Sequence, residues 1–75
     1  MISLSQMPTR TIYVALLDEA VDVWRPVEAI EEQGHYRLPD TAPDGERWEF
    51  APGSLVVCET RNLSEGPTLV GTGVV

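Results

Sequence analysis

The sequence predicts an all-β domain, a small barrel of five or six strands. Its length of 75 residues suits one domain and leaves no room for a second core. Short runs of β-branched and aromatic residues are separated by turn residues, and no apolar repeat of helical period extends along the chain. Short strands in such a small chain close most naturally into a barrel, because closure limits exposed edges.

The domain is expected to begin after a short leading segment. Residues 1–9 are polar and unpatterned, so we expect a disordered extension there, with Met7 as an alternative start of the protein. The barrel domain then comprises residues 10–75. Its first strand is predicted in residues 10–17, which are rich in β-branched and aromatic side chains and end at an acidic turn.

The second predicted strand shows an alternation of period two. One parity is apolar and consists of Val21, Val23, Val27 and Ala29. Arg25 interrupts this parity, which indicates a bend or an arginine stem lying along the edge of the core. Pro26 has no backbone N–H to donate, so this part of the strand is expected at an edge or a bulge.

A hairpin and a long loop are predicted next. Gln33, Gly34 and His35 form a compact turn that leads into a short strand over residues 36–38. Residues 39–46 hold two prolines and several acidic side chains, and the Asp44-Gly45 dipeptide is a strong turn signal. This stretch is therefore expected to be an exposed loop.

The last third of the chain alternates strands and turns. A short strand over residues 47–50 places Trp48 and Phe50 on one face, where both rings are expected to anchor the core. A Pro-Gly turn then precedes a strand over residues 55–59. A further turn over residues 63–67 leads into the final strand, 68–75. Gly71 and Gly73 in that strand indicate a bulge or a frayed end.

The charge balance limits the classes of partner. The formal net charge is −7, with twelve acidic residues against five arginines and no lysine. Nucleic-acid binding gains most of its affinity from cations that neutralise phosphates, so DNA and RNA are disfavoured partners. No apolar run is long enough for a membrane span and no secretory signal is evident. We therefore expect a cytoplasmic protein without a membrane partner.

The residues of common catalytic and metal sites are scarce. Cys58 and His35 are single in the sequence, which excludes an intrachain disulfide and the usual zinc sites. His35 has no nucleophile placed by a motif, and Cys58 lies in an apolar run typical of a buried thiol. The acidic residues match no calcium loop and the glycines match no nucleotide-binding pattern. We expect no enzymatic activity, no metal and no cofactor.

The order of these features resembles an SH3-like barrel of the Tudor or agenet kind. The stretches that carry the resemblance are Leu-Leu-Asp-Glu at 16–19, Trp-Arg-Pro-Val-Glu-Ala at 24–29, Tyr-Arg-Leu at 36–38 and Phe-Ala-Pro-Gly-Ser at 50–54. The chain is also similar to small uncharacterised bacterial proteins with the same first two motifs and Trp-Glu-Phe at 48–50. The Tudor-like resemblance implies recognition of methylated side chains by an aromatic cage, or contacts with protein tails or nucleic acid. The resemblance to the small bacterial proteins does not point to a known activity.

Trp24 is the residue from which a function is predicted. If Val23 and Val27 face inward, Trp24 lies on the outer face near the carboxylates of Asp22 and Glu28. Exposed tryptophans are common at binding hot spots, and an acidic surround suits a basic or apolar segment. The alternatives are that Trp24 faces the core or covers a neighbouring strand.

Two functions follow from this pattern. The first is a protein-interaction module that docks a partner through Trp24, Asp22, Glu28 and Tyr36. The second is an accessory protein that binds basic surfaces through charge alone. The expected oligomeric state is a monomer or a weak homodimer, because an open edge near Pro26 or in the C-terminal strand could pair with another chain.

Overall fold

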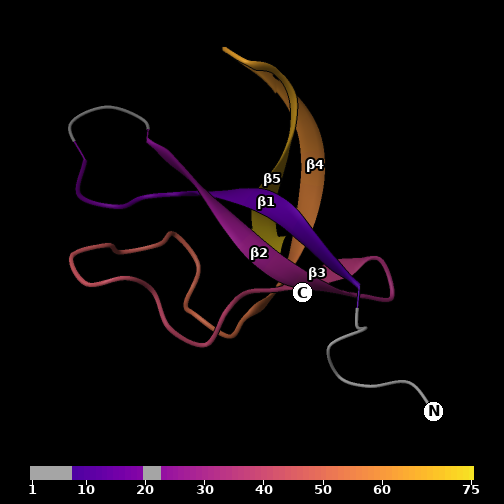
Figure 1. Ribbon diagram of the computed structural model, residues 1–75, viewed down its shortest axis with the longest axis horizontal. Coiled ribbons are helices and arrows are strands. Elements are labelled where there is room, and N and C mark those ends of the chain that lie inside the picture. Colours follow the sequence, from indigo (N-terminus) through magenta and orange to yellow (C-terminus); the bar gives the residue numbers. More distant parts are fainter. Residues whose placement is uncertain (1–7, 20–22) are drawn as a thin grey trace.

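The computed structural model describes residues 8–19 and 23–75 and contains five β-strands arranged as a closed barrel (Figure 1). Neighbouring strands in the barrel follow the order of the chain. The strands are β1 (Thr9–Ala15), β2 (Trp24–Glu32), β3 (His35–Arg37), β4 (Leu55–Leu63) and β5 (Gly66–Val74). The predicted small all-β barrel is confirmed, and the architecture is consistent with an SH3-like barrel.

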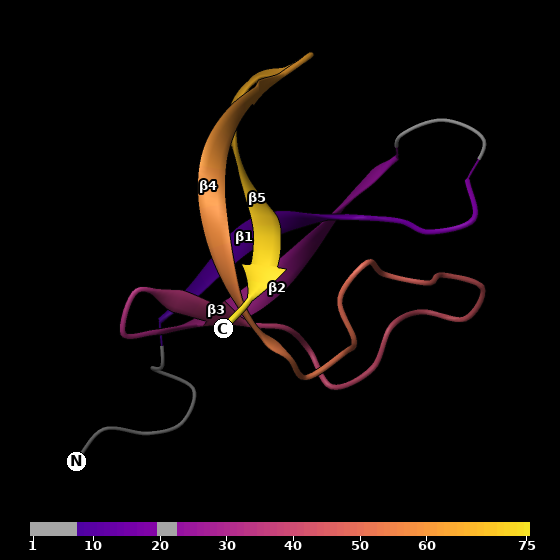
Figure 2. The same ribbon diagram turned by 180° about the vertical axis from the view of Figure 1, so that it is seen from behind.

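The relative direction of the two strands that close the barrel follows from the number of strands. Each successive pair from β1 to β5 is antiparallel, so β5 is parallel to β1 where the two strands pair. Figure 2 shows β5 in front of β1. The closing pair is therefore parallel, and it contains a single register position, Tyr13 opposite Val70. This seam is much shorter than the β1–β2 and β4–β5 ladders, so the two long hairpins are joined only locally.

The hairpin between β2 and β3 has the tight turn that the sequence predicts. Gln33 and Gly34 form a two-residue loop closed by the pair of Glu32 with His35. Both loop residues have positive φ, 53° and 84°, as a type I′ turn requires. Arg37 on β3 donates to the Glu32 carboxylate at 2.7 Å, and this hydrogen bond holds the pKa of Glu32 below its usual value.

The predicted strand over residues 47–50 is wrong. Only one bridge forms, between Leu16 and Trp48, and two backbone hydrogen bonds flank it. Leu17 N donates to Arg47 O at 2.6 Å, and Glu49 N donates to Ala15 O at 2.8 Å. Turns stand close on both sides, at residues 43–46 and 51–54. The chain therefore crosses the end of β1 without room for a longer ladder.

The core lies inside the barrel and contains residues of β1 to β4 and of the long loop, residues 38–54, that joins β3 to β4. The buried residues of the main cluster are Ile12, Val14, Val27, Ala29, Tyr36, Leu38, Trp48 and Val56. Alternate positions on β1 and β2 supply the first four of them, as a period of two requires. Trp48 is only 6% exposed, and the partly buried Phe50 packs against the cluster, so the predicted inward direction of these rings is confirmed.

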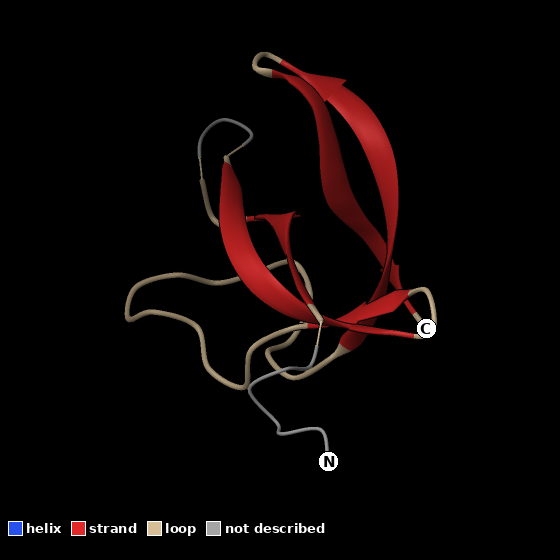
Figure 3. Cartoon of the chain, turned by 45° about the vertical axis from the view of Figure 1, so that its right-hand side comes forward, coloured by secondary structure: helices blue, strands red, loops and turns tan. Residues whose placement is uncertain are grey.

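The β4–β5 hairpin contains the irregularity that the glycines predict. Val57 pairs with Gly73 and Cys58 pairs with Gly71, so Thr72 is an extra residue in the ladder. This is a β-bulge, and it brings the backbone of Gly71 against the ring of Phe50. Past the pairing of Val70 with Tyr13, the hairpin continues as a two-stranded arm (Figure 3). Within the described residues, the protein has no helix that is both long and apolar enough to cross a membrane.

Candidate binding groove around Trp24

The direction of Trp24 follows from the alternation along β2. Val27 and Ala29 are buried in the barrel, so the opposite parity carries Trp24, Pro26 and Glu28 on the other face of the strand. Pro26 and Glu28 are exposed, whereas Trp24 is half-buried. Another part of the molecule must therefore shield the indole, although Trp24 lies outside the main core.

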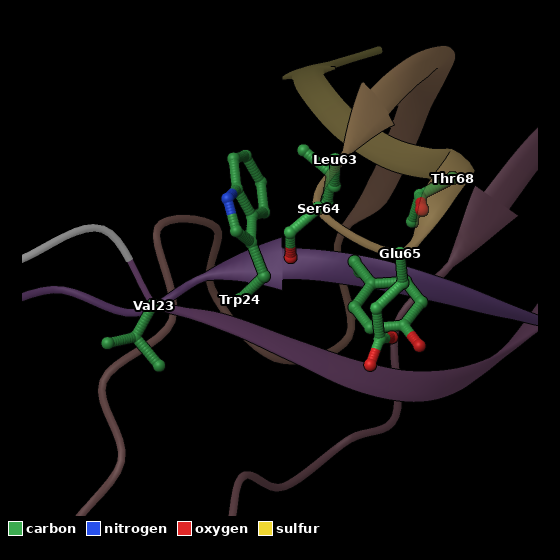
Figure 4. A pocket seen from close by; sticks show the side chains of 7 residues that line it. Val23, Trp24, Leu63, Ser64, Glu65 and Thr68 are labelled. Atoms are coloured by element: carbon green, nitrogen blue, oxygen red, sulfur yellow. The ribbon is translucent and has the colours of Figure 1, made fainter.

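The tip of the β4–β5 hairpin lies across a cavity from Trp24. A cavity of about 440 Å³ separates the tip from the outer face of β1 and β2. Figure 4 shows Trp24 beside the hairpin residues that line the same space. The lining residues are Tyr13, Val23, Trp24, Leu63, Ser64, Glu65 and Thr68, and we call this cavity the Trp24 groove.

A second cavity adjoins the groove through shared residues. It measures about 300 Å³, and Val23 and Trp24 line it as well. Its other walls come from β1, β4, the bulged part of β5 and the long loop. These residues are Ala15, Leu16, Glu49, Arg61, Gly71 and Thr72. Trp24 is thus common to both depressions between the two long hairpins.

The two cavities differ in charge. Among the residues that the structure describes, Glu65 is the charged residue that lines the Trp24 groove, whose other walls are aromatic, aliphatic and hydroxyl-bearing. The second cavity contains Glu49 and Arg61, which have opposite charges. A cation that enters the Trp24 groove meets aromatic side chains, which attract cations through their faces, and the Glu65 carboxylate. The groove therefore favours apolar and cationic groups over anions.

An ion pair and hydrogen bonds hold the start of β2 in place. Leu16 N donates to Val23 O at 2.9 Å, which extends the β1–β2 pairing to the residue before Trp24. On the opposite face, Arg25 lies 2.6 Å from Glu46, whose side chain is only 13% exposed. The same carboxylate accepts a hydrogen bond from the indole N–H of Trp48 at 3.1 Å. The backbone on either side of Trp24 is therefore held in place, at Val23 by pairing with β1 and at Arg25 by the ion pair.

The other residues of the predicted site lie elsewhere. Glu28 shares the face of Trp24, is exposed, and accepts a hydrogen bond from the Thr11 hydroxyl. Tyr36 is a core residue, 8% exposed, and its hydroxyl lies 3.5 Å from a Glu31 carboxylate oxygen. Asp22 lies outside the described residues. Of the three described members of the predicted set, Trp24 lines the groove and Glu28 and Tyr36 do not.

The other residues that line the groove were not predicted from the sequence. Tyr13 alternates with the buried Ile12 and Val14, so its outward direction could have been found from the periodicity of β1. The contribution of Leu63 and Glu65 could not have been found in this way, because these residues are far from Trp24 in the sequence. A turn motif alone does not specify the face against which a hairpin tip lies.

The single histidine and cysteine lie apart from this groove. Neither His35 nor Cys58 lines either cavity. Within residues 8–19 and 23–75, no three His, Cys, Asp or Glu side chains gather as a metal site. Cys58 is partly buried against the core, and desolvation raises the pKa of its thiol. A raised pKa leaves less of the reactive thiolate at neutral pH.

Cys58 is accordingly expected to react slowly with alkylating reagents. In the folded protein at neutral pH, iodoacetamide should modify it more slowly than it modifies the same cysteine in urea, corrected for solvent with a model thiol. Mass spectrometry of timed samples measures both rates. A folded-state rate equal to or above the unfolded rate contradicts the raised thiol pKa.

Comparison with protein-family models, curated proteins and solved structures gives no match for this chain. What the sequence and the structure support together is a small closed five-stranded β-barrel. The functional interpretation therefore depends on the groove itself.

Proposed function

We propose that this protein is an interaction module that binds an extended segment of a partner protein in the Trp24 groove. The observation that supports this proposal is the position of Trp24, which is half-buried between two cavities and belongs to both. Tryptophan is enriched among the residues that dominate binding energy, particularly where the surrounding surface excludes water. Such a groove suits a segment that places successive side chains in adjoining depressions.

The chemistry of the groove indicates which segment fits. Tyr13 and Trp24 contribute aromatic rings, and Leu63 offers an aliphatic contact. Glu65 and the net charge of −7 favour a positive partner. The proposed ligand is therefore a peptide segment in which apolar residues accompany arginine or lysine.

Replacement of Trp24 is the direct test. A synthetic peptide of alternating leucine and arginine should bind the natural chain and should bind Trp24→Ala at least tenfold more weakly, because the indole contributes to both cavities. Fluorescence anisotropy of the labelled peptide measures the dissociation constants. Emission of Trp48, which stays in the variant, verifies that the barrel is folded.

Matched controls show whether the peptide binds in the Trp24 groove. Leu17 is an exposed apolar residue, 41% accessible, that lines neither cavity, and Leu17→Ala should leave binding unchanged. A peptide of alternating leucine and glutamate should bind weakly. Equal losses in Trp24→Ala and Leu17→Ala, or equal binding of both peptides, would argue against the groove.

The alternative function is binding of basic surfaces through charge alone, which the net charge of −7 supports. Salt separates the two functions, because screening at physiological ionic strength weakens interactions between exposed charges. Groove binding should keep most of its affinity when salt is raised from low to physiological concentration. Affinity that collapses with salt and does not depend on Trp24 would identify the charge-driven function.

A further inference from the structure

Strand β4 has a long edge to which the barrel adds no strand. On the side of β3, pairing is limited to Tyr36 with Val56 and Arg37 with Leu55. Beyond Val56, no strand of the described chain pairs with this edge. Residues 59–62 are all exposed, so both faces of this part of the arm are also in contact with solvent. An edge of this kind presents free backbone N–H and C=O groups.

The register of the β4–β5 hairpin shows which backbone groups are free. Asn62 pairs with Pro67, which has no N–H, so this must be a non-hydrogen-bonded pair of the ladder. The closing pair of Leu63 with Gly66 is then hydrogen-bonded, as a two-residue hairpin loop requires. By alternation, the backbone groups of Cys58, Thr60 and Asn62 point away from β5.

The other edge of the same hairpin is blocked. By the same alternation, Pro67 and Leu69 direct their backbone groups away from β4, towards the side on which β1 lies. Pro67 cannot donate a hydrogen bond, which prevents extension of the ladder there. Within β4 no proline protects the opposite edge. One edge of the arm is thus closed to an added strand and the other is open.

The sequence of the open edge is complementary to itself. In an antiparallel pair of two β4 strands centred on Thr60, Glu59 lies opposite Arg61 of the second copy. The two-fold symmetry repeats this ion pair. Flanking pairs bring together Val57 with Leu63 and Cys58 with Asn62. The Glu59–Arg61 pairs occupy non-hydrogen-bonded positions, where cross-strand side chains come closest.

We propose that two copies of this protein associate through their β4 edges, in antiparallel register centred on Thr60. The two strands then exchange backbone hydrogen bonds at Thr60 and at the Cys58–Asn62 pairs, and each Glu59 binds Arg61 of the other copy. Within one copy Arg61 lies 3.9 Å from Glu59, and both side chains are more than half exposed, so both are available for this exchange. The contact uses the edge of the arm, and it includes Leu63 and Arg61, which also line the two cavities beside Trp24.

Charge reversal tests the register. Sedimentation equilibrium over a range of concentrations should show dimers of the natural chain. E59R and R61E should each raise the dissociation constant at least tenfold, because each places like charges opposite one another at both symmetric positions. The doubly reversed variant E59R/R61E restores the opposite charges and should dimerise like the natural chain.

A mixture of the two single variants gives the most specific result. E59R carries two cations on the edge and R61E carries two anions, so together they should form a heterodimer although neither forms a stable homodimer. Thr60→Pro removes an N–H that faces the second copy, not β5, and should also give a folded monomer. A natural chain that stays monomeric, or dimers that are insensitive to these changes, would overturn the proposal.

Discussion

Trp48→Ala is expected to lower the free energy of unfolding by about 3 to 5 kcal/mol, the usual cost of removing a large aromatic side chain from a core. Trp48 is 6% exposed and belongs to the main hydrophobic cluster. It is also the residue through which the long loop bridges to Leu16 at the end of β1. A domain of this size has a stability of only a few kcal/mol, so most molecules of the variant should be unfolded in water.

Circular dichroism of Trp48→Ala in water measures its unfolded fraction, and urea titration followed by circular dichroism measures the stability of the natural chain and the milder variants. Trp48→Phe retains most of the buried ring but removes the N–H that donates to Glu46 at 3.1 Å, so it should cost less than Trp48→Ala. Trp24→Ala is the matched control, because it removes the same atoms from the half-buried groove. Comparable losses from the two alanine variants would mean that Trp24 has a core role, which contradicts its assignment to a binding surface.

Gly71→Val is the second substitution with a large expected effect, a loss of about 1 to 3 kcal/mol from overpacking. A Cβ atom at this buried position lies 3.3 Å from Phe50 Cε2 and 3.8 Å from Val14 Cγ1. The branched valine adds methyl groups beyond that atom. Phe50 has to move away from the bulged strand, and the packing of the long loop is disturbed with it.

Gly73 supplies the control for this prediction. It lies two positions along the same strand, where an added Cβ has an ordinary contact of 3.6 Å with Val57 Cγ2. Gly73→Ala should therefore change stability by less than about 0.5 kcal/mol, and Gly71→Ala should be the less stable of the two. Thermal unfolding of the variants provides the ranking. If Gly71→Val is as stable as Gly73→Ala, the close approach of Phe50 does not limit the site.

Much of the fold could be predicted because its signals are local. The period of two on the first two strands, the tight turn at Gln33 and Gly34, and the bulge near Gly71 each depend on a few adjacent residues. The failure at residues 47–50 has the opposite cause. Alternation identified the inward direction of Trp48, but strand length depends on how much backbone a distant partner offers. The end of β1 offers a single position.

The candidate site also combines features that adjacent residues predict with features that depend on distant segments. Alternation on β2 identified Trp24, since Val27 and Ala29 required one face of the strand for the core. The prediction also included Tyr36, which lies in the core because it is opposite the buried Val56 and shares its inward face. The other walls of the groove come from β1 and from the tip of the β4–β5 hairpin.

The sequence by itself determined the five strands of the barrel, most of the turns and the net charge, because these depend on neighbouring residues. It left the direction of Trp24 open between the outer face and the core. Only the tertiary structure decided what Trp24 faces and which strand edge stays open. The single β1–β5 pair sets where the long hairpin stands relative to β2, and the short β3 leaves most of β4 unpaired. Both result from contacts between segments far apart in the chain, for which the local pattern of residues contains no signal.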